Sequence, residues 1–433
     1  MQNEIVGLKE KLLRDYDQSL NQDGINGSRV ATRLEEISNI GLTSDGGSNR
    51  VGFSKEERQA KELVKKWMIE LELEVKEDGA GNVFGRLNGI NNEMPAILAG
   101  SHLDSVPNGG HFDGPLGVVA ALEVVESWKE TGYQPVRPFE VVIFSDEEGA
   151  RFNGGLTGSE AMMGDVDVSH KLTLKDSKGL SFEEVLRADN LTLEGYQNSM
   201  RDHSEIGAFV EVHIEQGKLL EKENLPCGIV TGIAGPCWIE MIFEGKAGHA
   251  GNTPMFDRQD ALIAASEFIF RLKELPTNIS KSAVATVGKL NVYPNGVNVI
   301  PGKVQLYVDI RDIFEETRDT LVEEALKLAS SIAKNHEIEL TWKENTKIKP
   351  VPIKQEMQQM ILSTMESLNI RPFFLPSGAG HDAMMVGKSI PVAMLFVQSK
   401  GGISHNPKEW SSLYDCLSAV HVLKGVVEKL VSK

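Results

Sequence analysis

Residues 100–117 read GSHLDSVPNGGHFDGPLG, and this stretch decides the fold. The apolar run just before it, residues 96–99, predicts a buried strand that ends at His102. Asp113 follows a glycine-rich loop and precedes a helical pattern that begins near Leu116. Glycines let such loops approach each other closely. A neutral imidazole and a carboxylate held in this way suit a divalent metal such as zinc.

Asp104 lies two residues after His102, where its carboxylate would orient the imidazole from behind a metal. A plainer interpretation is also open at this point. The loop would then be an ordinary polar connection, with Asp113 as the N-cap of the following helix. The rest of the chain has to decide between the two.

The composition is that of an ordinary globular protein, with 433 residues, 41% hydrophobic residues and 25% charged residues. This length favours two domains. A net charge of −17 argues against a nucleic-acid or anionic-membrane partner. The three cysteines form no disulfide or CxxC pattern, and the N-terminal segment has no apolar signal region. We therefore expect a cytoplasmic protein without a membrane span.

Strands and helices alternate along the first half of the chain. Ser54 and Glu57 predict a capping box at the start of a long helix, and residues 83–87 predict a short strand. A helix at about 116–130 leads into a β-branched apolar run, Phe139–Ser145. Such alternation indicates a largely parallel sheet. Residues 1–40 predict one or two amphipathic helices, and residues 164–205 predict polar helix and loop excursions; later strands are expected at 206–213 and 227–233.

The pattern changes from Trp238 onward. Strands are expected at 238–243, 283–292, 304–310 and 338–342, with helices at 258–272 and 316–334. The order β-α-β-β-α-β is that of a ferredoxin-like unit. The first pattern then resumes with a helix at 355–368, a strand at 392–397 and a terminal helix at 411–430. The sequence thus predicts one discontinuous α/β domain, 1–231 and 349–433, that carries an inserted α+β domain, 232–348.

Three further polar features stand at or just past predicted strand ends. They are the acidic turn Ser145–Gly149 (SDEEG), the strand-borne histidine of Val210–Gly217 (VEVHIEQG) and the histidine of Gly401–Pro407 (GGISHNP). Each has a structural interpretation when taken alone. Ligand sites in open α/β sheets lie beyond strand ends, however. Together with His102 and Asp113, the features supply three histidines, two acidic ligands and a spare carboxylate. That set is typical of a two-metal hydrolase.

The chain resembles the metallopeptidase-like amidohydrolases, the M20-type family that includes N-carbamoyl-L-amino-acid hydrolases, allantoate amidohydrolases and β-alanine synthase. The resemblance covers nearly the whole chain, and its motifs are GSHLDSVPNGGHFDG, SDEEGARF, VHIEQG, GHAGNTPM, NVIPG with DIRD, SGAGHDA and GISHNPKE. It implies a mixed, mostly parallel sheet flanked by helices, as in di-zinc peptidases. The insert would be a ferredoxin-like lid and dimerisation domain.

The resemblance also implies roles for individual residues. Asp113 would bridge two divalent metal ions per subunit, which could be zinc, manganese, cobalt or nickel. His102 and His213 would complete one site, and Glu148 and His405 the other. Glu147 would be the general base that deprotonates the bridging water.

In the inserted domain the resemblance implies that His249 polarises the scissile carbonyl. Asn298 and Arg311 would hold the substrate carboxylate, and Gln216 would contact substrate near the metals. From the residues alone, His249 fits an ordinary loop equally well, and an arginine at a strand end more often forms a surface ion pair. Relatives form homodimers through this domain, so a homodimer is expected. His381 and Asp382 are expected near the pocket, without an assigned role.

The expected reaction is hydrolysis of an N-carbamoyl-L-amino acid to the L-amino acid, carbon dioxide and ammonia, at a linear ureido C–N bond, by a water that two metals activate. Allantoate is the nearest alternative substrate; Arg151–Ser159 (RFNGGLTGS) modestly favours the carbamoyl compound. Ureidoglycolate, β-ureidopropionate and peptide substrates are less favoured. A non-catalytic metal-binding scaffold is the alternative of a different class, and the complete ligand set with a spare Glu147 argues against it.

Overall fold

The computed structural model describes residues 7–432, which form two compact units. Unit 1 comprises the chain up to Val230, Ile353–Leu375 and the chain from His381 onward. Unit 2 comprises Thr231–Pro352 and Pro376–Gly380. The expected helices within residues 1–40 are seen from Leu8 as α1 and α2; the first six residues lie outside the described part.

Unit 1 is built on a mixed sheet whose strand order is β1-β2-β4-β3-β5-β15-β6-β13, with β14 beside β6. The chain crosses into unit 2 within this sheet, so β13 and the last residues of β6 and β14 are counted with unit 2. The pairs β4–β3, β3–β5 and β5–β15 are parallel, whereas β1–β2, β2–β4, β15–β6 and β6–β13 are antiparallel. The strands are β1 (Glu74–Glu77), β2 (Val83–Leu87), β3 (Ala96–His102), β4 (Phe139–Phe144), β5 (Ile206–Ile214), β6 (Cys227–Ile233), β13 (Val351–Pro352), β14 (Phe374–Ser377) and β15 (Val392–Val397).

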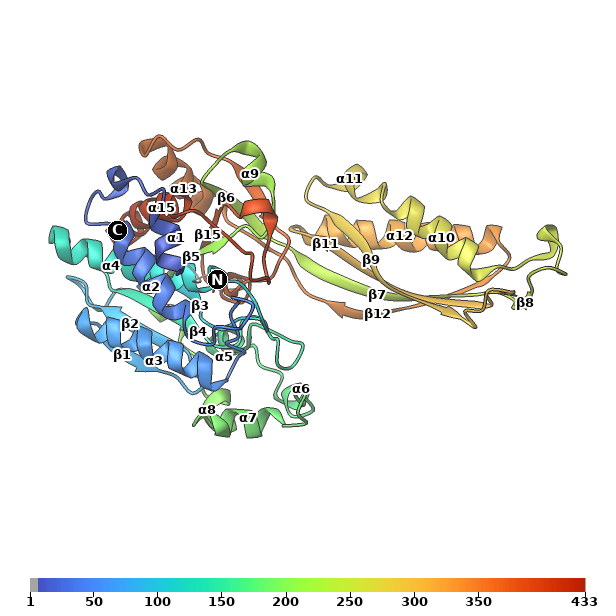
Figure 1. Ribbon diagram of the computed structural model, residues 1–433, viewed down its shortest axis with the longest axis horizontal. Coiled ribbons are helices and arrows are strands. Elements are labelled where there is room, and N and C mark those ends of the chain that lie inside the picture. The colour runs from blue at the N-terminus through green and yellow to red at the C-terminus, as the bar shows by residue number, and fades with distance from the viewer. Residues whose placement is uncertain (1–6, 433) are drawn as a thin grey trace, which may run out of the picture. The chain divides into compact units, whose positions relative to one another are not determined.

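Helices flank this sheet (Figure 1). They are α1 (Leu8–Leu13), α2 (Gly27–Ser38), α3 (Lys55–Glu70), α4 (Pro115–Thr131), α5 (Thr157–Met163), α6 (Val168–Lys171), α7 (Phe182–Ala188), α8 (Leu193–Gln197), α9 (Leu219–Glu223), α13 (Gln355–Ser367), α14 (Asp382–Val386) and α15 (Leu413–Val431). The strands β3, β4 and β15 are buried along their whole length, as their unbroken apolar runs predict. Helix α4 packs closely on β3 and β5, so that a Cβ at Gly117 would lie 2.8 Å from the Cβ of Ser101 and 2.4 Å from the carbonyl oxygen of Val212.

Unit 2 has the ferredoxin-like order that the sequence predicts. Its four-stranded antiparallel sheet runs β12-β7-β11-β9, and α10 and α12 lie together on one side of it (Figure 1). A two-stranded ribbon, β8–β10, is an addition that the sequence did not reveal. The elements are β7 (Gly235–Glu244), β8 (Gly248–His249), α10 (Ala261–Leu272), α11 (Leu275–Ile279), β9 (Val284–Tyr293), β10 (Val299–Ile300), β11 (Lys303–Asp312), α12 (Glu315–Asn335) and β12 (Glu339–Lys347).

The start of α3 differs in detail from the predicted capping box. The hydroxyl of Ser54 accepts the backbone N–H of Glu57, as expected. The carboxylate of Glu57 does not return to Ser54, however, but accepts the N–H of Phe53 and pairs with Lys61 at 2.6 Å. Because Glu57 and Lys61 are fully buried, the carboxylate serves the buried ion pair as well as the helix end.

Lys61 joins α3 to the end of β4. Its ammonium group also donates to the hydroxyl of Ser145, the first residue of the acidic turn, at 2.7 Å. Removing one partner of a buried ion pair leaves an uncompensated charge. We therefore expect Lys61→Met to lower the free energy of unfolding by about 3 kcal/mol in urea titrations, and a second change, Glu57→Gln, to restore most of it.

The control for this experiment lies on the same helix. Lys66 pairs with Glu70 at 3.7 Å on the surface, and both side chains are mostly exposed. Lys66→Met should change the free energy of unfolding by less than about 1 kcal/mol. Equal effects of the two lysine substitutions would contradict the importance assigned to the buried pair.

Candidate metal centre

Four neighbouring parallel strands, β4, β3, β5 and β15, deliver the candidate ligands to one edge of the sheet. His102 is the last residue of β3, and His213 is the last but one of β5. Glu148 follows the end of β4, and His405 follows β15 after a longer loop. Because the carboxyl ends of parallel strands meet at the same edge, residues far apart in the sequence come together there.

The first cluster consists of His102, Asp113 and His213, whose nearest ligand atoms all lie within 4.8 Å of one another. Oδ1 of Asp113 is 3.1 Å from Nε2 of His213 and 3.6 Å from Nε2 of His102. All three residues are buried. Two imidazoles and one carboxylate in this arrangement match the donors of a divalent metal site.

The second cluster uses the other oxygen of the same aspartate. It consists of Asp113, Glu148 and His405, again within 4.8 Å. Nε2 of His405 is 3.5 Å from Oδ2 of Asp113 and 3.2 Å from Oε2 of Glu148. About half of the His405 side chain is exposed, so this cluster opens to solvent whereas the first is closed. Asp113 is thus shared by the two clusters.

The residue next to Asp113 must be glycine. Gly114 has a φ of 82°, and a Cβ there would lie 2.4 Å from the imidazole of His102. Gly114 is also the N-cap residue of α4, so Asp113 is not the helix cap that the plainer interpretation of the sequence required. Its carboxylate faces the histidines instead.

Asp104 lies behind the first cluster and joins two ligand loops. One oxygen of its carboxylate is 3.4 Å from Nδ1 of His102, which also contacts the carbonyl oxygen of Asp104 at 3.1 Å. The carboxylate accepts the backbone N–H groups of Glu147 and Glu148, each at 3.1 Å. Asp104 therefore ties the end of β3 to the acidic turn after β4.

Charges in the centre are tightly coupled. Burial opposes ionisation of Asp113, but the neighbouring imidazoles of His213 and His102 hold the pKa of this carboxyl below its usual range. The hydrogen bond with Glu148 raises the pKa of His405 to about 9. Burial raises the pKa of Glu147 well above its usual value, and nearby carboxylates, among them Asp382, add to the rise.

The residues present fit a pair of divalent cations. Nε2 of His102 is buried and has no hydrogen-bond partner among the described residues, although it points to Asp113. A buried polar nitrogen without a partner is costly, and a metal ion would satisfy it. Glu147 belongs to neither cluster, but its Oε2 lies 3.6 Å from the same nitrogen.

Several polar neighbours of the clusters have contacts that sequence reasoning did not assign. The amide of Gln216 donates to Oδ2 of Asp113 at 2.7 Å and to the hydroxyl of Ser404 at 3.2 Å. The ring of His381 lies 4.4 Å from that of His213, centre to centre. Asp382 is fully buried at the start of α14, and its carboxylate interacts electrostatically with His102 and Glu147, so both residues lie beside the first cluster. Only their place in the SGAGHDA motif could have indicated this.

His249, Asn298 and Arg311 belong to unit 2. His249 pairs with Val299 across the β8–β10 ribbon, and the carbonyl of Asn298 accepts the N–H of Ala250, so these two lie together. Arg311 lies near the opposite end of β11, where it pairs with Asp309 at 2.8 Å.

The distance between Asn298 and Arg311 limits how the two side chains could act together. Asn298 lies beyond the first residue of β11, Lys303, and Arg311 lies near its last. A strand rises about 3.3 Å per residue, so the eight steps from Lys303 to Arg311 alone span about 26 Å. A single copy of unit 2 therefore cannot hold one substrate carboxylate with both side chains.

Comparison with known proteins agrees with this site. The profile described as "Peptidase family M20/M25/M40" matches residues 98–429. The chain belongs to this M20 peptidase family. It is 42% identical to an N-carbamoyl-L-amino acid amidohydrolase of Geobacillus stearothermophilus, over 94% of this chain and 99% of the relative. It is 36% identical to an allantoate amidohydrolase of Bacillus subtilis, over 93% and 97%.

Solved structures of the M20 family extend the likeness to the fold. An amidase of the hydantoinase/carbamoylase family from Burkholderia multivorans matches with a TM-score of 0.89 and 32% identity, over 95% of this chain and 99% of that one. The chain is thus an M20 protein related to the hydantoinase/carbamoylase amidohydrolases. Among the described residues, no helix combines the length and apolarity that crossing a membrane requires.

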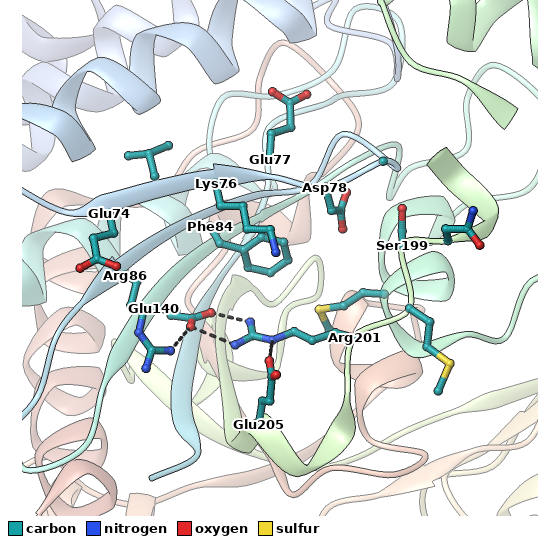
Figure 2. A pocket seen from close by; sticks show the side chains of 15 residues that line it. Glu74, Lys76, Glu77, Asp78, Phe84, Arg86, Glu140, Ser199, Arg201 and Glu205 are labelled. Carbon is teal, nitrogen blue, oxygen red and sulfur yellow. Dashed lines mark hydrogen bonds and ion pairs between the residues drawn. The ribbon is translucent and has the colours of Figure 1, made fainter. Parts of the chain in front are cut away.

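Unit 1 of this M20 protein also contains a cavity of about 660 Å³ whose lining includes no residue of either cluster. Figure 2 shows the charged side chains of its lining, where Glu140 accepts hydrogen bonds from Arg86 and Arg201. Arg201 also pairs with Glu205 and lies over the ring of Phe84. Because these charges pair with one another, we interpret them as structural.

His111 lies in the same loop as Asp113 but has a structural role. Its Nε2 donates to the carbonyl of Gly46 at 2.9 Å, and its Nδ1 accepts from the hydroxyl of Ser48 at 2.9 Å. Both contacts suit the neutral ring, and burial lowers the pKa of His111 to about 4. Protonation therefore costs more in the folded state than in the unfolded chain.

This difference predicts a pH dependence of stability. Between pH 6.5 and 4 the unfolded chain binds the proton at His111 and the folded chain does not, so the free energy of unfolding should fall as the pH falls. The full effect is about 3 kcal/mol. Urea titrations of wild type and His111→Gln at pH 5 and pH 7.5 measure it. A stability difference between the two proteins that does not change with pH would contradict the interpretation that His111 is buried in its neutral form.

Proposed function

We propose that this protein hydrolyses N-carbamoyl-L-amino acids to the L-amino acid, carbon dioxide and ammonia. The observation that carries the proposal is the carboxylate of Asp113, which two donor clusters share, beside a carboxylate, Glu147, that belongs to neither. The Geobacillus relative, 42% identical, is named for this substrate class. In this proposal unit 1 is the catalytic domain and unit 2 is the lid and dimerisation domain.

Two divalent cations would be held by the two clusters. His102, Asp113 and His213 would hold one, and Glu148 and His405 with Asp113 the other. Imidazole and carboxylate donors accept zinc, manganese, cobalt or nickel. When bound, such ions lower the pKa of water and polarise a carbonyl group.

Glu147 has the properties of the proton carrier in this reaction. It is held next to His102, and burial raises the pKa of its carboxyl, which makes its carboxylate a stronger base. Glu147 would take a proton from the attacking water and return it to the leaving nitrogen. His249 would donate to the carbonyl oxygen of the ureido group as negative charge develops there.

Substrate binding would combine residues of both units. Gln216 stands at the clusters through its bond to Asp113, where its amide can also reach a ureido group. Arg311 and Asn298 have the donors that a carboxylate needs. Because they lie at opposite ends of β11, we propose that two copies of the chain contribute them, with Arg311 from one copy and Asn298 and His249 from the other.

A homodimer through unit 2 would meet this requirement. Strand β9 is at the edge of its sheet, with one neighbour, β11, among the described residues. On the adjoining helix α10, Ile263 and Phe270 are 54% and 64% exposed. An open strand edge beside exposed apolar side chains suits pairing with a second copy of the same surface.

Allantoate is the second candidate substrate, because the Bacillus subtilis relative named for it is 36% identical over nearly the same length. Ammonia release from N-carbamoyl-L-methionine, its D-enantiomer and allantoate, by protein loaded with zinc or manganese, separates the possibilities. We expect release from the L-carbamoyl compound. Release from allantoate alone would show that allantoate, and not the L-carbamoyl compound, is the substrate. A non-catalytic scaffold would release ammonia from none of the three.

The role of Glu147 predicts a separation of activity from metal binding. Glu147→Gln keeps the size of the side chain but removes its basicity, so turnover should fall by about 10²-fold or more. The metal content, measured by atomic absorption, should stay unchanged because Glu147 belongs to neither cluster. Turnover near the wild-type value would remove Glu147 from this role.

The shared aspartate predicts different metal losses for two variants. Asp113→Asn should weaken both sites, because both clusters use this carboxylate. His405→Ala should weaken one site and leave the His102–Asp113–His213 site filled. Metal-to-protein ratios after dialysis against buffer should therefore be near zero and near one. Equal ratios in the two variants would contradict the sharing of Asp113.

A further inference from the structure

Glu409, in the GISHNPKE motif, connects two loops of the metal centre. Its side chain is buried, with 3% of the residue exposed. One oxygen accepts the backbone N–H of Phe112 at 2.8 Å and that of Asp113 at 3.2 Å. The second oxygen lies 3.2 Å from the hydroxyl of Ser404. The carboxylate thus joins the loop before α4 to the loop after β15, which are almost 300 residues apart in the sequence.

The connection continues to the shared ligand. The hydroxyl of Ser404 donates to Oδ2 of Asp113 at 2.7 Å, and His405 is the next residue along the chain. Glu409 therefore reaches Asp113 by two routes, through its main-chain N–H and through Ser404. Among the described residues no hydrogen bond joins Glu409 to the carboxylate of Asp113 or to the ring of His405. Apart from the interaction of its charge with theirs, it acts on both through the loops that carry them.

The chain leaves space for this carboxylate. A Cβ at Gly110 would lie 2.0 Å from the carboxyl carbon of Glu409, which only glycine avoids. Nearby, the rings of Phe112 and Trp410 pack edge to face at 5.8 Å and join the same two loops. The absence of a side chain at Gly110 and this aromatic contact are independent signs that the two loops are built to meet around Glu409.

We propose that Glu409 is a positioning residue of the metal centre, which sets the spacing between Asp113 and His405 and thereby the affinity for metal. The inference rests on the proposed binding of cations by these two residues. Partners that orient metal ligands change affinity by about 10- to 100-fold when they are removed. The effect should be largest at the Asp113–Glu148–His405 site, since Glu409 holds two of its three ligand loops.

The test measures zinc affinity of the apoprotein by competition with a chromophoric chelator. Glu409→Ala should weaken the second zinc ion by about 10- to 100-fold. Glu409→Gln keeps an oxygen for the N–H groups of Phe112 and Asp113 and places an N–H donor towards Ser404, so its affinity should stay close to that of the wild type. If Glu409→Ala lowered the zinc affinity only through a general loss of stability, Glu409→Gln would not selectively restore that affinity.

Two further variants keep the test decisive. Glu123, on α4, is a fully buried carboxylate that accepts the N–H of Asn26 at 2.7 Å, away from both loops. Glu123→Ala should lower the melting temperature without changing zinc affinity. Gly110→Ala displaces the Glu409 carboxylate and should lower the zinc affinity, as Glu409→Ala does. This variant therefore tests the proposal even if Glu409→Ala does not fold.

The outcomes separate the inference from the function on which it rests. Wild-type affinity for both zinc ions in Glu409→Ala, or in Gly110→Ala if the former does not fold, would overturn the positioning role and leave the proposed function intact. A wild-type protein that binds no zinc, manganese, cobalt or nickel would overturn both. A protein that binds two ions but releases no ammonia would overturn the proposed reaction alone.

Discussion

Asp113 holds a buried carboxylate at the edge where four parallel strands end, and both donor clusters are completed by its two oxygens. The sheet topology brings His102, His213, Glu148 and His405 to this edge, but only the shared aspartate makes them one centre. A glycine on its C-terminal side, a hydroxyl and an amide on Oδ2, and two main-chain bonds to Glu409 fix its position. Much of unit 1 near the strand ends is arranged around one side chain.

The sequence predicted the fold class and the placement of the chemistry because both depend on short-range patterns. Unbroken apolar runs identified the buried strands β3, β4 and β15, and the polar residues that follow such runs lie at the strand ends in the structure. The β-α-β-β-α-β order of unit 2 could be predicted equally well, since each element has a clear hydrophobic periodicity. What brings His102 and His405 together is then only the rule that parallel strands end at a common edge.

Contacts between distant loops could not be predicted in the same way. In the sequence, Glu409 is an ordinary charged residue shortly after a proline. Nothing in the residues next to it predicts a hydrogen bond to the N–H of Phe112. The ribbon β8–β10 was missed because two-residue strands have no period. Asn298 and Arg311 are a different case. The strand predicted between them already implied their separation, and the family resemblance, which gave both a role at one carboxylate, did not say which copy of the chain supplies each.

Strand β9 gives unit 2 a ten-residue edge, Val284–Tyr293, with a single charged residue, Lys289. Val284, Leu290 and Tyr293 on it are 50%, 44% and 47% exposed. Open edges of this length are templates for uncontrolled association of extended chains, and proteins usually interrupt them with charge, proline or a bulge. In β9 the interruptions are Lys289 and a bulge at Gly288, where the pairing with β11 shifts between Tyr307 and Val308. A fragment consisting of unit 2 alone would keep this edge exposed on both sides of the bulge, together with its apolar side chains. An engineered monomer would need substitutions on β9 that prevent its pairing with other strands.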